Sequence, residues 1–523
     1  MRIRLPDLLT DVAGGTPDAP ALTVKDETLT YGALARGVDL AAGGLQRLGL
    51  ERGDRVAIYM EKRLETVAAI FGVSAAVGAF VPINPLLRPS QVGHVLADCG
   101  ARMLITSAPR FELLREVLDQ CPSVTHVVLV GAPEAATEEE PLLVTTWEAL
   151  VTGPGADDCG PGLVESDVAA ILYTSGSTGA PKGVVLSHRN LIAGAESVSH
   201  YLGNTADDVI LAVLPLSFDA GLSQLTTAFA VGAHVVLLDY LLPRDVVRAC
   251  ARHAVTGLTC VPPLWFQLAE QEWPLEATQR LRYFANTGGR MPKATLDRLR
   301  ALYPGAEPFL MYGLTEAFRS TYLDPSEVDR RPDSIGKAIP NAEILVVRPD
   351  GTQCDPDEEG ELVHRGPLVA LGYWNDPART AERFRPVPVA ARAAGAGELA
   401  VWSGDTVRRD ADGFLTFVGR RDEMIKTSGY RVSPTEIEEV AHATGLVRDA
   451  VACGVADDRL GQRVVLLVSP PPSGQVDIAG LQETLKKDLP RYMVPHEILV
   501  RPGLPRSPNG KFDRVALSKE LQP

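Results

Sequence analysis

The sequence predicts an α/β protein, in which a large N-terminal body of parallel or mixed sheets flanked by helices precedes a small α+β C-terminal domain. The first observation is a series of short apolar runs that alternate with helical patterns: RVAIYM (55–60), THVVLVG (125–131), VAAILYT (168–174), HVVLLD (234–239) and EILVVRP (343–349). Such runs, when helices separate them, are typical of parallel sheets with helices on both faces. The second observation is a restart of the chain with a helix after residues 413–434.

The small domain is predicted from this restart. A helical pattern at 435–443 is followed by a strand pair and by a second helical pattern over 478–493. About 100 residues is a typical size for a compact domain. We therefore divide the chain into a body at 1–421 and a small domain at 422–523, with the boundary at Asp422.

Composition and charge exclude some classes of partner. The chain has 523 residues, of which 45% are hydrophobic and 22% charged, which is ordinary for a globular protein with several cores. The net charge is −15 and the pI about 5.2. Because an acidic surface repels phosphate backbones and anionic lipids, we expect neither a nucleic acid nor a membrane as partner.

The cysteines and the N-terminus favour a cytoplasmic protein. The seven cysteines include no C-x-x-C pair, which predicts free thiols rather than disulfides or a zinc site. Pro6, Asp7 and Asp11 interrupt what would be the apolar core of a signal peptide. The apolar stretch 67–81 is too short to span a membrane and is closed by Pro82, so we expect a buried helix there.

The stretch ILYTSGSTGAPKGVVLSH (171–188) predicts a phosphate-binding loop directly after a strand. Glycines let the backbone approach a ligand, and these are Gly176, Gly179 and Gly183. Hydroxyls and backbone N–H groups can donate to phosphate oxygens, and a lysine adds positive charge. The side chains concerned are Thr174, Ser175, Ser177, Thr178 and Lys182. The alternative is a surface loop rich in Gly and Ser.

This loop is not a Walker A motif. Ala180 and Pro181 separate Gly179 from Lys182, and Lys182 is followed by Gly183 rather than by a hydroxyl residue. The loop therefore has no side chain placed to hold magnesium, and a metal ligand must come from elsewhere.

Five motifs in order resemble those of the adenylate-forming superfamily, which comprises acyl-CoA synthetases, peptide-synthetase adenylation domains and luciferases. They are TSGSTGAPKG (174–183), MYGLTEAF (311–318), WSGDT (402–406), GRRDEMIKTSGYRVSPTEIE (419–438) and LPRSPNGKFDR (504–514). The resemblance covers residues 10 to 517 and implies a distorted barrel in the body, a mobile small domain, and ATP and Mg²⁺ as ligands. The combination of SFDAGLSQLTTAF (217–229) with MYGLTEAFRSTYL (311–323) looks most like a subgroup of bacterial acyl-CoA ligase homologues found near exosortase loci.

The resemblance implies roles for residues in the ATP half of the site. Tyr312 packs on adenine, Thr315 meets the phosphate, and Glu316 holds Mg²⁺, which agrees with the preference of this cation for carboxylate oxygen. Lys511 bridges the acid and the α-phosphate. The remaining adenine and ribose residues are Gly288, Gly289, Arg290, Met311, Asp405 and Arg420.

The resemblance also implies a hinge and an acid pocket. Asp422 is the hinge, and the loop from Lys426 to Tyr430, with Gly429, enters the site for the second half-reaction. The acid pocket consists of Phe218, Asp219, Ser223, Cys260, Thr287 and Arg319.

The substrate is left open between two alternatives. Asp219 pairs either with the ammonium of an amino acid or with Arg319, in which case the pair shapes a pocket for a small polar acid without an ammonium. Because no carrier domain follows Lys511, we expect an external thiol acceptor, either CoA or the phosphopantetheine of a separate carrier protein. The alternatives to an acid–thiol ligase are a non-catalytic homologue or one that couples the adenylate to another nucleophile.

Overall fold

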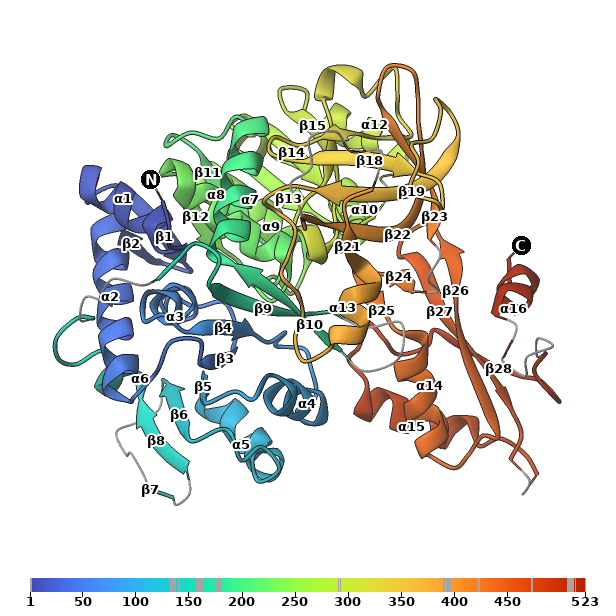
Figure 1. The fold of residues 1–523 in the computed structure, drawn as a ribbon, viewed down its shortest axis with the longest axis horizontal. Helices are drawn as coiled ribbons and strands as arrows, with labels where there is room; N and C mark the ends of the chain where they lie inside the picture. The colour runs from blue at the N-terminus through green and yellow to red at the C-terminus, as the bar shows by residue number, and fades with distance from the viewer. Residues whose placement is uncertain are drawn as a thin grey trace.

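The computed structural model places a large body beside a smaller C-terminal lobe (Figure 1). This architecture confirms the predicted α/β class. Asp422 lies outside the described residues, so the domain boundary stays a prediction. The described residues are 2–131, 138–139, 142–156, 163–174, 181–289, 291, 293–388, 391, 397–420, 424–471, 474–505, 512 and 514–522.

The first sheet of the body is built mainly from parallel strands. Its strands, in order across the sheet, are β20 (Gly372–Tyr373), β10 (Lys182–Ser187), β9 (Val168–Thr174), β4 (Ala79–Pro82), β3 (Arg55–Tyr59), β5 (Met103–Ser107), β6 (His126–Val130), β8 (Leu142–Thr146) and β7 (Glu138–Glu139). Pairing is parallel from β9 to β8, whereas β10 returns antiparallel along β9. The predicted phosphate loop therefore connects a β-hairpin at one side of this sheet.

Helices cover both faces of the first sheet. Alternate residues of β3 and β5 face two different cores, because successive side chains of a strand point to opposite faces. The helices are α2 (Tyr31–Arg47) and α3 (Leu64–Ala75) on one face and α4 (Pro89–Cys99) and α5 (Ala108–Leu118) on the other, with the short α6 (Trp147–Leu150) at the edge.

The buried helix expected at 67–81 is shorter than expected. The helix α3 is buried but ends at Ala75, and residues 79–82 form β4 instead. Val77 has a φ of 60°, which stops the helix at a tight turn before Gly78. In the part of the chain that the structure describes, no helix is long and apolar enough to cross a membrane.

The second sheet is long and changes character along its width. Its strands, in order, are β2 (Glu27–Thr30), β1 (Pro20–Val24), β12 (His234–Leu237), β11 (Val209–Ala212), β13 (Gly257–Cys260), β14 (Tyr283–Asn286), β15 (Glu307–Tyr312), β16 (Thr321–Leu323), β17 (Ser334–Ala338), β23 (Leu415–Arg420), β22 (Leu399–Arg409), β19 (Glu359–Arg365) and β18 (Glu343–Val347). The short β21 (Phe384–Pro386) also pairs with β22. Pairing is parallel from β1 to β15 and antiparallel from β15 to β18.

The parallel direction expected for residues 343–349 is therefore wrong. Residues 343–347 form β18, which pairs antiparallel with β19 because the connection at 348–358 contains no crossover helix. This antiparallel section, in which β18, β19 and β22 carry apolar side chains on both faces, is the part of the body that the resemblance implies to be a distorted barrel.

Two layers of helices sandwich the second sheet. The main core of the molecule lies between the two sheets and contains α1 (Asp7–Gly15), α7 (His188–Tyr201) and α8 (Asp219–Val231). On the other face lie α9 (Pro243–His253), α10 (Pro262–Ala269), α11 (Leu275–Thr278) and α12 (Lys293–Leu302). The remaining helical turns of the body are η1 (Thr315–Ala317), η2 (Pro325–Glu327) and α13 (Pro377–Arg383).

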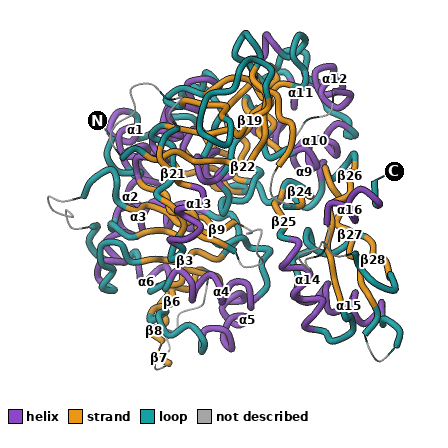
Figure 2. Tube along the Cα trace, turned by 45° about the vertical axis from the view of Figure 1, so that its right-hand side comes forward, coloured by secondary structure: helices purple, strands orange, loops and turns teal. Residues whose placement is uncertain are grey.

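The C-terminal lobe has its own sheet and its own core. The sheet consists of β25 (Tyr430–Val432), β24 (Ile425–Thr427), β27 (Gly461–Ser469), β26 (Asp449–Asp457) and β28 (Glu497–Val500). The helices α14 (Pro434–Ala443) and α15 (Ile478–Asp488) pack on one face and α16 (Arg514–Glu520) on the other. The second predicted helix, over 478–493, ends five residues early because Leu489 precedes Pro490 and is extended. In the turned view the hairpin β24–β25 is the part of this lobe nearest the body (Figure 2).

Six of the seven cysteines lie in described residues, and all six are free, as the sequence predicts. Cys159 lies outside the described residues.

Candidate active site

The candidate site lies at the carboxyl ends of β9, β11, β14 and β15, where the hairpin of the small lobe approaches the body. Thr174 ends β9 and Lys182 begins β10, and the two residues pair directly across the hairpin. The Thr174 hydroxyl is buried and has no hydrogen-bond partner among the described residues. Its orphan oxygen suits a ligand that offers hydrogen-bonding oxygens. The rest of the predicted phosphate loop, residues 175–179, lies outside the described residues.

A buried network joins the predicted phosphate lysine to the predicted metal ligand. Lys182 Nζ donates to the Tyr373 hydroxyl at 2.7 Å, and this hydroxyl donates to Glu316 Oε1 at 2.6 Å. Lys182 Nζ also lies 3.2 Å from the same carboxylate oxygen. Glu316 is held at this place by η1, which directly follows β15. The two ends of the network therefore come from different sheets.

The network shifts the pKa values of both end groups. Burial lowers the pKa of Lys182, and the Glu316 charge opposes this. Burial alone would raise the pKa of Glu316, but the charges of Lys182 and Arg431, with the Tyr373 hydrogen bond, hold it well below its usual range. Glu316 is therefore ionised at neutral pH.

Glu316 fits the role of a magnesium ligand. Its second oxygen, Oε2, is buried and has no hydrogen-bond partner among the described residues. In the described part of the chain, no group of three or more His, Cys, Asp or Glu side chains could hold a metal by itself. A single carboxylate oxygen is what a magnesium ion needs when phosphates and waters supply its other ligands.

The predicted adenine and ribose residues form a second polar group. The Tyr312 hydroxyl donates to Asp405 Oδ2, and Asp405 is buried on β22, where its backbone lies opposite Arg420 of β23. Gly288, with a φ of 76°, follows β14, and a Cβ there would lie 3.3 Å from Val261. Thr315 is half-buried in η1 and Met311 is buried on β15, whereas Arg290 lies outside the described residues.

The predicted acid-pocket residues separate into four groups. Thr287 and Arg319 form a polar pair, in which Arg319 Nη1 donates to the Thr287 hydroxyl at 2.7 Å, and the charge of Arg319 acts on Asp219. Ser223 bonds to Thr227 at 3.3 Å within α8. Cys260 belongs to the apolar core on the far face of the second sheet, and burial raises the pKa of its thiol.

Asp219 and Arg319 do not pair with each other. Among the described residues no carboxylate lies within 4.0 Å of the Arg319 guanidinium, and no cation lies that close to the Asp219 carboxylate. Burial raises the pKa of Asp219, although the charges of Arg319 and Arg431 and the N–H of Ala220 oppose this.

The backbone between Glu316 and Arg319 is strained. Phe318 has φ and ψ of 55° and −60°, which is unusual for a large side chain. Its ring is fully buried against Gly194, where a Cβ would lie 2.5 Å from the ring. Packing of this ring therefore holds the turn that places Glu316 and Arg319 in one site.

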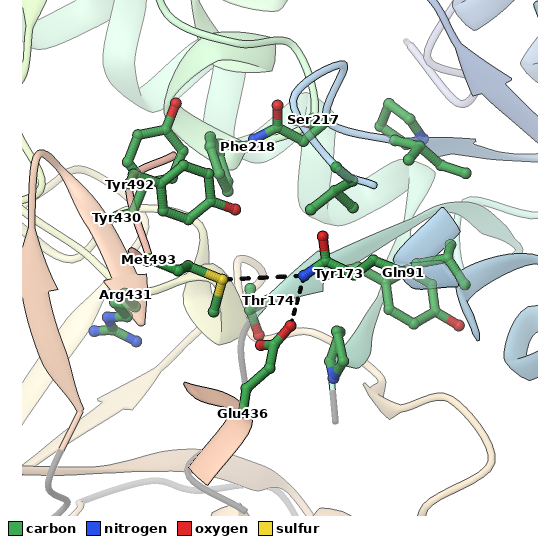
Figure 3. A pocket seen from close by; sticks show the side chains of 16 residues that line it. Gln91, Tyr173, Thr174, Ser217, Phe218, Tyr430, Arg431, Glu436, Tyr492 and Met493 are labelled. Carbon is green, nitrogen blue, oxygen red and sulfur yellow. Dashed lines mark hydrogen bonds between the residues drawn. The ribbon is translucent and has the colours of Figure 1, made fainter. Parts of the chain in front are cut away.

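The fourth predicted group, Phe218, lies in a cavity between the body and the small lobe (Figure 3). Its ring centroid is 5.3 Å from that of Tyr430, which in turn stacks on Tyr492 at 3.7 Å. Asn84 and Ser217 also line the cavity, and each has a buried polar atom without a hydrogen-bond partner in the described structure. With the Thr174 hydroxyl, which also lines the cavity, three of its polar groups have no hydrogen-bond partner among the described residues.

The hairpin β24–β25 brings the small lobe to the site. Its turn residues Ser428 and Gly429 have φ of 54° and 81°, which are the positive values of a type I′ turn. A Cβ at Gly429 would lie 2.7 Å from Val261 Cγ2. Lys426 Nζ lies 4.8 Å from the centroid of the Phe417 ring. The turn thus approaches the body so closely that only glycine fits.

Polar contacts hold the two parts in this arrangement. Gln91 Nε2 donates to Glu436 Oε1 at 2.6 Å, and Arg88 donates to the Lys486 carbonyl at 3.0 Å (Figure 3 shows the first contact). An exposed ion pair joins Arg459 to Glu270 at 3.6 Å.

Sequence reasoning missed several residues of this site. Tyr373 lies in GYWN (372–375), which belongs to none of the motifs above. Arg431 lies within the motif at 419–438, but only its neighbours were assigned a function. Asn84 and Ser217 carry no local signal, because only the folded chain brings them to the cavity. Lys511, Asp422 and the centre of the phosphate loop lie outside the described residues.

Comparison with known proteins gives the family. The AMP-binding enzyme family matches residues 9–374, and the AMP-binding enzyme C-terminal domain matches residues 436–511. An L-proline–[L-prolyl-carrier protein] ligase of Streptomyces coelicolor is 34% identical over 536 residues, which cover 100% of this chain and 97% of that protein. A long-chain-fatty-acid–CoA ligase of Salmonella typhimurium is 30% identical over 550 residues, which cover 99% of this chain and 94% of that protein.

Two solved structures of one enzyme differ in their similarity to this fold. A double mutant of o-succinylbenzoate CoA synthetase from Bacillus subtilis, bound to a product analogue, is 25% identical, covers 98% of both chains and gives a TM-score of 0.83. The same enzyme in complex with its acyl-adenylate intermediate is 26% identical, covers 99% of this chain and 98% of its own, and gives a TM-score of 0.68. The chain as a whole is thus more similar to the product-analogue complex than to the acyl-adenylate complex.

Proposed function

The chain belongs to the family of AMP-binding enzymes, the adenylate-forming superfamily that its motifs resemble, and on that premise we propose that it activates a small polar carboxylic or amino acid and transfers the acyl group to a thiol. The family makes it an ATP-dependent, AMP-forming acid–thiol ligase. What we propose beyond the family is the class of acid and the nature of the thiol.

The first half-reaction joins two anions. A carboxylate oxygen of the acid attacks the α-phosphorus of ATP, the new O–P bond gives an acyl-adenylate, and the bond to the β-phosphate breaks to release pyrophosphate. Positive charge and fixed geometry are what this step needs.

The observation that carries the proposal is the network of Lys182, Tyr373 and Glu316. Lys182 lies where the phosphate loop ends, and Tyr373 and Glu316 hold its ammonium in place at 2.7 and 3.2 Å. Phosphate oxygens compete with Glu316 for this ammonium, so ATP binding leaves Glu316 with its carboxylate directed to the phosphates. A bound magnesium ion would neutralise phosphate charge there, and Glu316 Oε2 would hold it.

Other residues bind the nucleoside and the acid. Asp405, held by Tyr312, offers carboxylate oxygen to the ribose hydroxyls. Thr174 and Thr315 offer hydroxyls to the phosphates. Lys511, from the small domain, remains the predicted bridge between the acid and the α-phosphate. Asp219 offers a carboxylate to a substrate ammonium.

The second half-reaction uses the other arrangement of the small domain. The thiolate sulfur attacks the acyl carbon, a C–S bond forms, and AMP leaves with the electrons of the broken C–O bond. We infer that the hairpin from Lys426 to Tyr430 faces the site in this step, and that the small domain turns at Asp422 to present Lys511 in the first. The higher TM-score against a product-analogue complex supports the assignment of the present arrangement to the transfer step.

The thiol is external to the chain in this proposal, either CoA or the phosphopantetheine of a separate carrier protein. The cavity lined by Asn84, Ser217, Phe218 and Tyr430 is where we place its amide-containing arm. The unpartnered Asn84 Nδ2 and Ser217 hydroxyl support this placement, because such an arm carries hydrogen-bonding groups along an apolar chain.

ATP–pyrophosphate exchange with a panel of small acids and amino acids tests the proposal. We expect label from pyrophosphate to enter ATP with at least one acid. Cleavage of ATP to ADP and phosphate would contradict it. Mass spectrometry after addition of CoA, or of a carrier protein that bears phosphopantetheine, then identifies the thioester. If no thioester forms and an added amine gives an amide, the alternative nucleophile is favoured.

A further inference from the structure

We propose that the acid activated at this site is an amino dicarboxylic acid, whose ammonium binds Asp219 and whose second carboxylate binds Arg319. The inference rests on the proposed function, since it names the substrate class of the same site. The assignment of Arg319 as the binding group for a second carboxylate is its new element.

Arg319 is a buried cation that lacks an anion. Its residue is 2% exposed, and its Nη1 donates to the neutral hydroxyl of Thr287 at 2.7 Å. Its Nε is buried and has no hydrogen-bond partner among the described residues. A guanidinium presents its N–H groups as a fork that matches a carboxylate. The unused donors of Arg319 therefore suit an anionic ligand.

Other partly buried arginines of the same protein have carboxylate partners. Arg514, whose side chain is 18% exposed, pairs through both nitrogens with Glu438, and Arg282 pairs with Asp208 at 2.8 Å. Arg365 pairs with Glu398 at 2.6 Å. A buried unpaired charge is expensive, and the fold leaves Arg319, like the less buried Arg409 with its unpartnered Nη2, without a carboxylate among the described residues.

Asp219 is the complementary group across the site. It is the first residue of α8 and half-buried, and the charge of Arg319 acts on it without an ion pair within 4.0 Å. Thr287 at the end of β14 holds Arg319, and α8 holds Asp219. Because separate elements anchor the two groups, the fold keeps two opposite charges apart. A ligand with one cation and one anion bridges this gap.

The other charged groups of the site restrict the ligand further. A neutral amino acid satisfies Asp219 but leaves Arg319 buried without an anion. A plain dicarboxylic acid satisfies Arg319 but places negative charge beside Asp219 and near Glu316, whose charges already repel each other. A long-chain fatty acid satisfies neither. An amino dicarboxylic acid provides the reacting carboxylate, the ammonium and the second carboxylate together.

Pyrophosphate exchange on matched acids tests the assignment. The panel contains aspartate and glutamate, their monoamides, the deaminated dicarboxylic acids, and neutral amino acids of similar length. We expect kcat/KM for an amino dicarboxylic acid to exceed that for its monoamide and its deaminated form by at least tenfold. The Arg319→Gln variant is expected to lose the preference over the monoamide, and Asp219→Asn the preference over the deaminated acid.

Arg282→Gln is the matched control, because it removes a structural arginine outside the site. It should lower thermal stability and keep the order of preferred acids. If Arg319→Gln does not fold, thermal shifts of the wild-type protein with each acid and a non-hydrolysable ATP analogue give the same ranking. A wild-type preference for neutral or deaminated acids would overturn the inference while leaving the proposed function intact. Exchange with no acid at all would instead contradict the proposed function.

Discussion

Two buried or half-buried carboxylates of one site, Glu316 and Asp219, have pKa values that move in opposite directions. The pKa of Glu316 is lowered, because Lys182, Arg431 and Tyr373 outweigh its burial. The pKa of Asp219 is raised, because burial outweighs the more distant charges of Arg319 and Arg431. The fold thus pairs the Glu316 charge with Lys182 and leaves Asp219 without an ion pair among the described residues. The predictions below test this difference, from the largest expected effect to the smallest.

Replacement of Glu316 by Gln should give the largest loss. It removes the metal-binding oxygen and leaves Lys182 buried beside a neutral amide, so kcat/KM for pyrophosphate exchange should fall about 10²- to 10³-fold. The free protein should also lose about 3–5 kcal/mol of unfolding free energy, as for other broken buried pairs. Exchange kinetics and denaturant unfolding measure the two effects. Unchanged stability would mean that the pair with Lys182 is not formed in solution.

Replacement of Asp219 by Asn should separate function from stability. A substrate ammonium would lose its anion, so KM for the amino acid should rise about tenfold to a hundredfold, from the 1–3 kcal/mol that a poorly paired buried charge costs. The free protein should keep its stability or gain some, because the variant removes a carboxylate whose burial is uncompensated. If the variant instead lost much of its unfolding free energy and kept the same KM for every substrate, Asp219 would have a structural role.

Gly429→Ala should slow acyl transfer and spare adenylation. The new Cβ would lie 2.7 Å from Val261, and the φ of 81° costs an alanine about 1–2 kcal/mol. We expect at least about tenfold slower thioester formation from a supplied acyl-adenylate, a factor that corresponds to about 1.4 kcal/mol. Gly445→Ala is the control, because it has a φ of 67° with nothing within 4 Å of its Cβ. Equal losses in both variants would point to unfolding of the lobe instead of a blocked approach.

Tyr373→Phe should have a smaller effect. Lys182 and Glu316 still meet at 3.2 Å, but both lose the hydroxyl between them. Affinity for ATP with magnesium should fall about fivefold to tenfold, consistent with about 1–1.5 kcal/mol for one typical hydrogen bond. Calorimetric titration with and without magnesium measures it. Equal loss under both conditions would assign Tyr373 to the phosphates alone and not to Glu316.

The pH dependence of stability should have opposite signs at the two carboxylates. Glu316 has a lowered pKa, so its stabilisation is present above its unfolded value near 4.5 and is lost as the pH falls through its folded value. Asp219 has a raised pKa, so its protonated form favours folding below 3.8, and this is lost as the pH rises through its folded value. Denaturant unfolding should be measured from pH 7 to pH 3. As the pH falls, the loss of unfolding free energy in Glu316→Gln and any gain in Asp219→Asn should both become smaller.

The sequence predicts the phosphate half better than the acid half. The strand before Thr174, the loop ending at Lys182 and the turn carrying Glu316 are local patterns, and their motifs identify the family. The relation between Asp219 and Arg319 depends on Thr287 and on the strained turn at Phe318, which are contacts between distant elements. The antiparallel direction of the strand at 343–347 was not predicted for a similar reason. An apolar run does not show with which neighbouring strand it pairs.

Pyrophosphate exchange by the wild type, Glu316→Gln and Arg319→Gln, measured side by side over the acid panel, tests the division of the site most directly. We predict that Glu316→Gln lowers the rate for every acid by a similar factor and keeps their order. Arg319→Gln should instead change the order of the acids and leave KM for MgATP unchanged. If Arg319→Gln lowered the rate equally for every acid, or altered KM for MgATP without changing the order, the two halves would not be separate and the account would be contradicted.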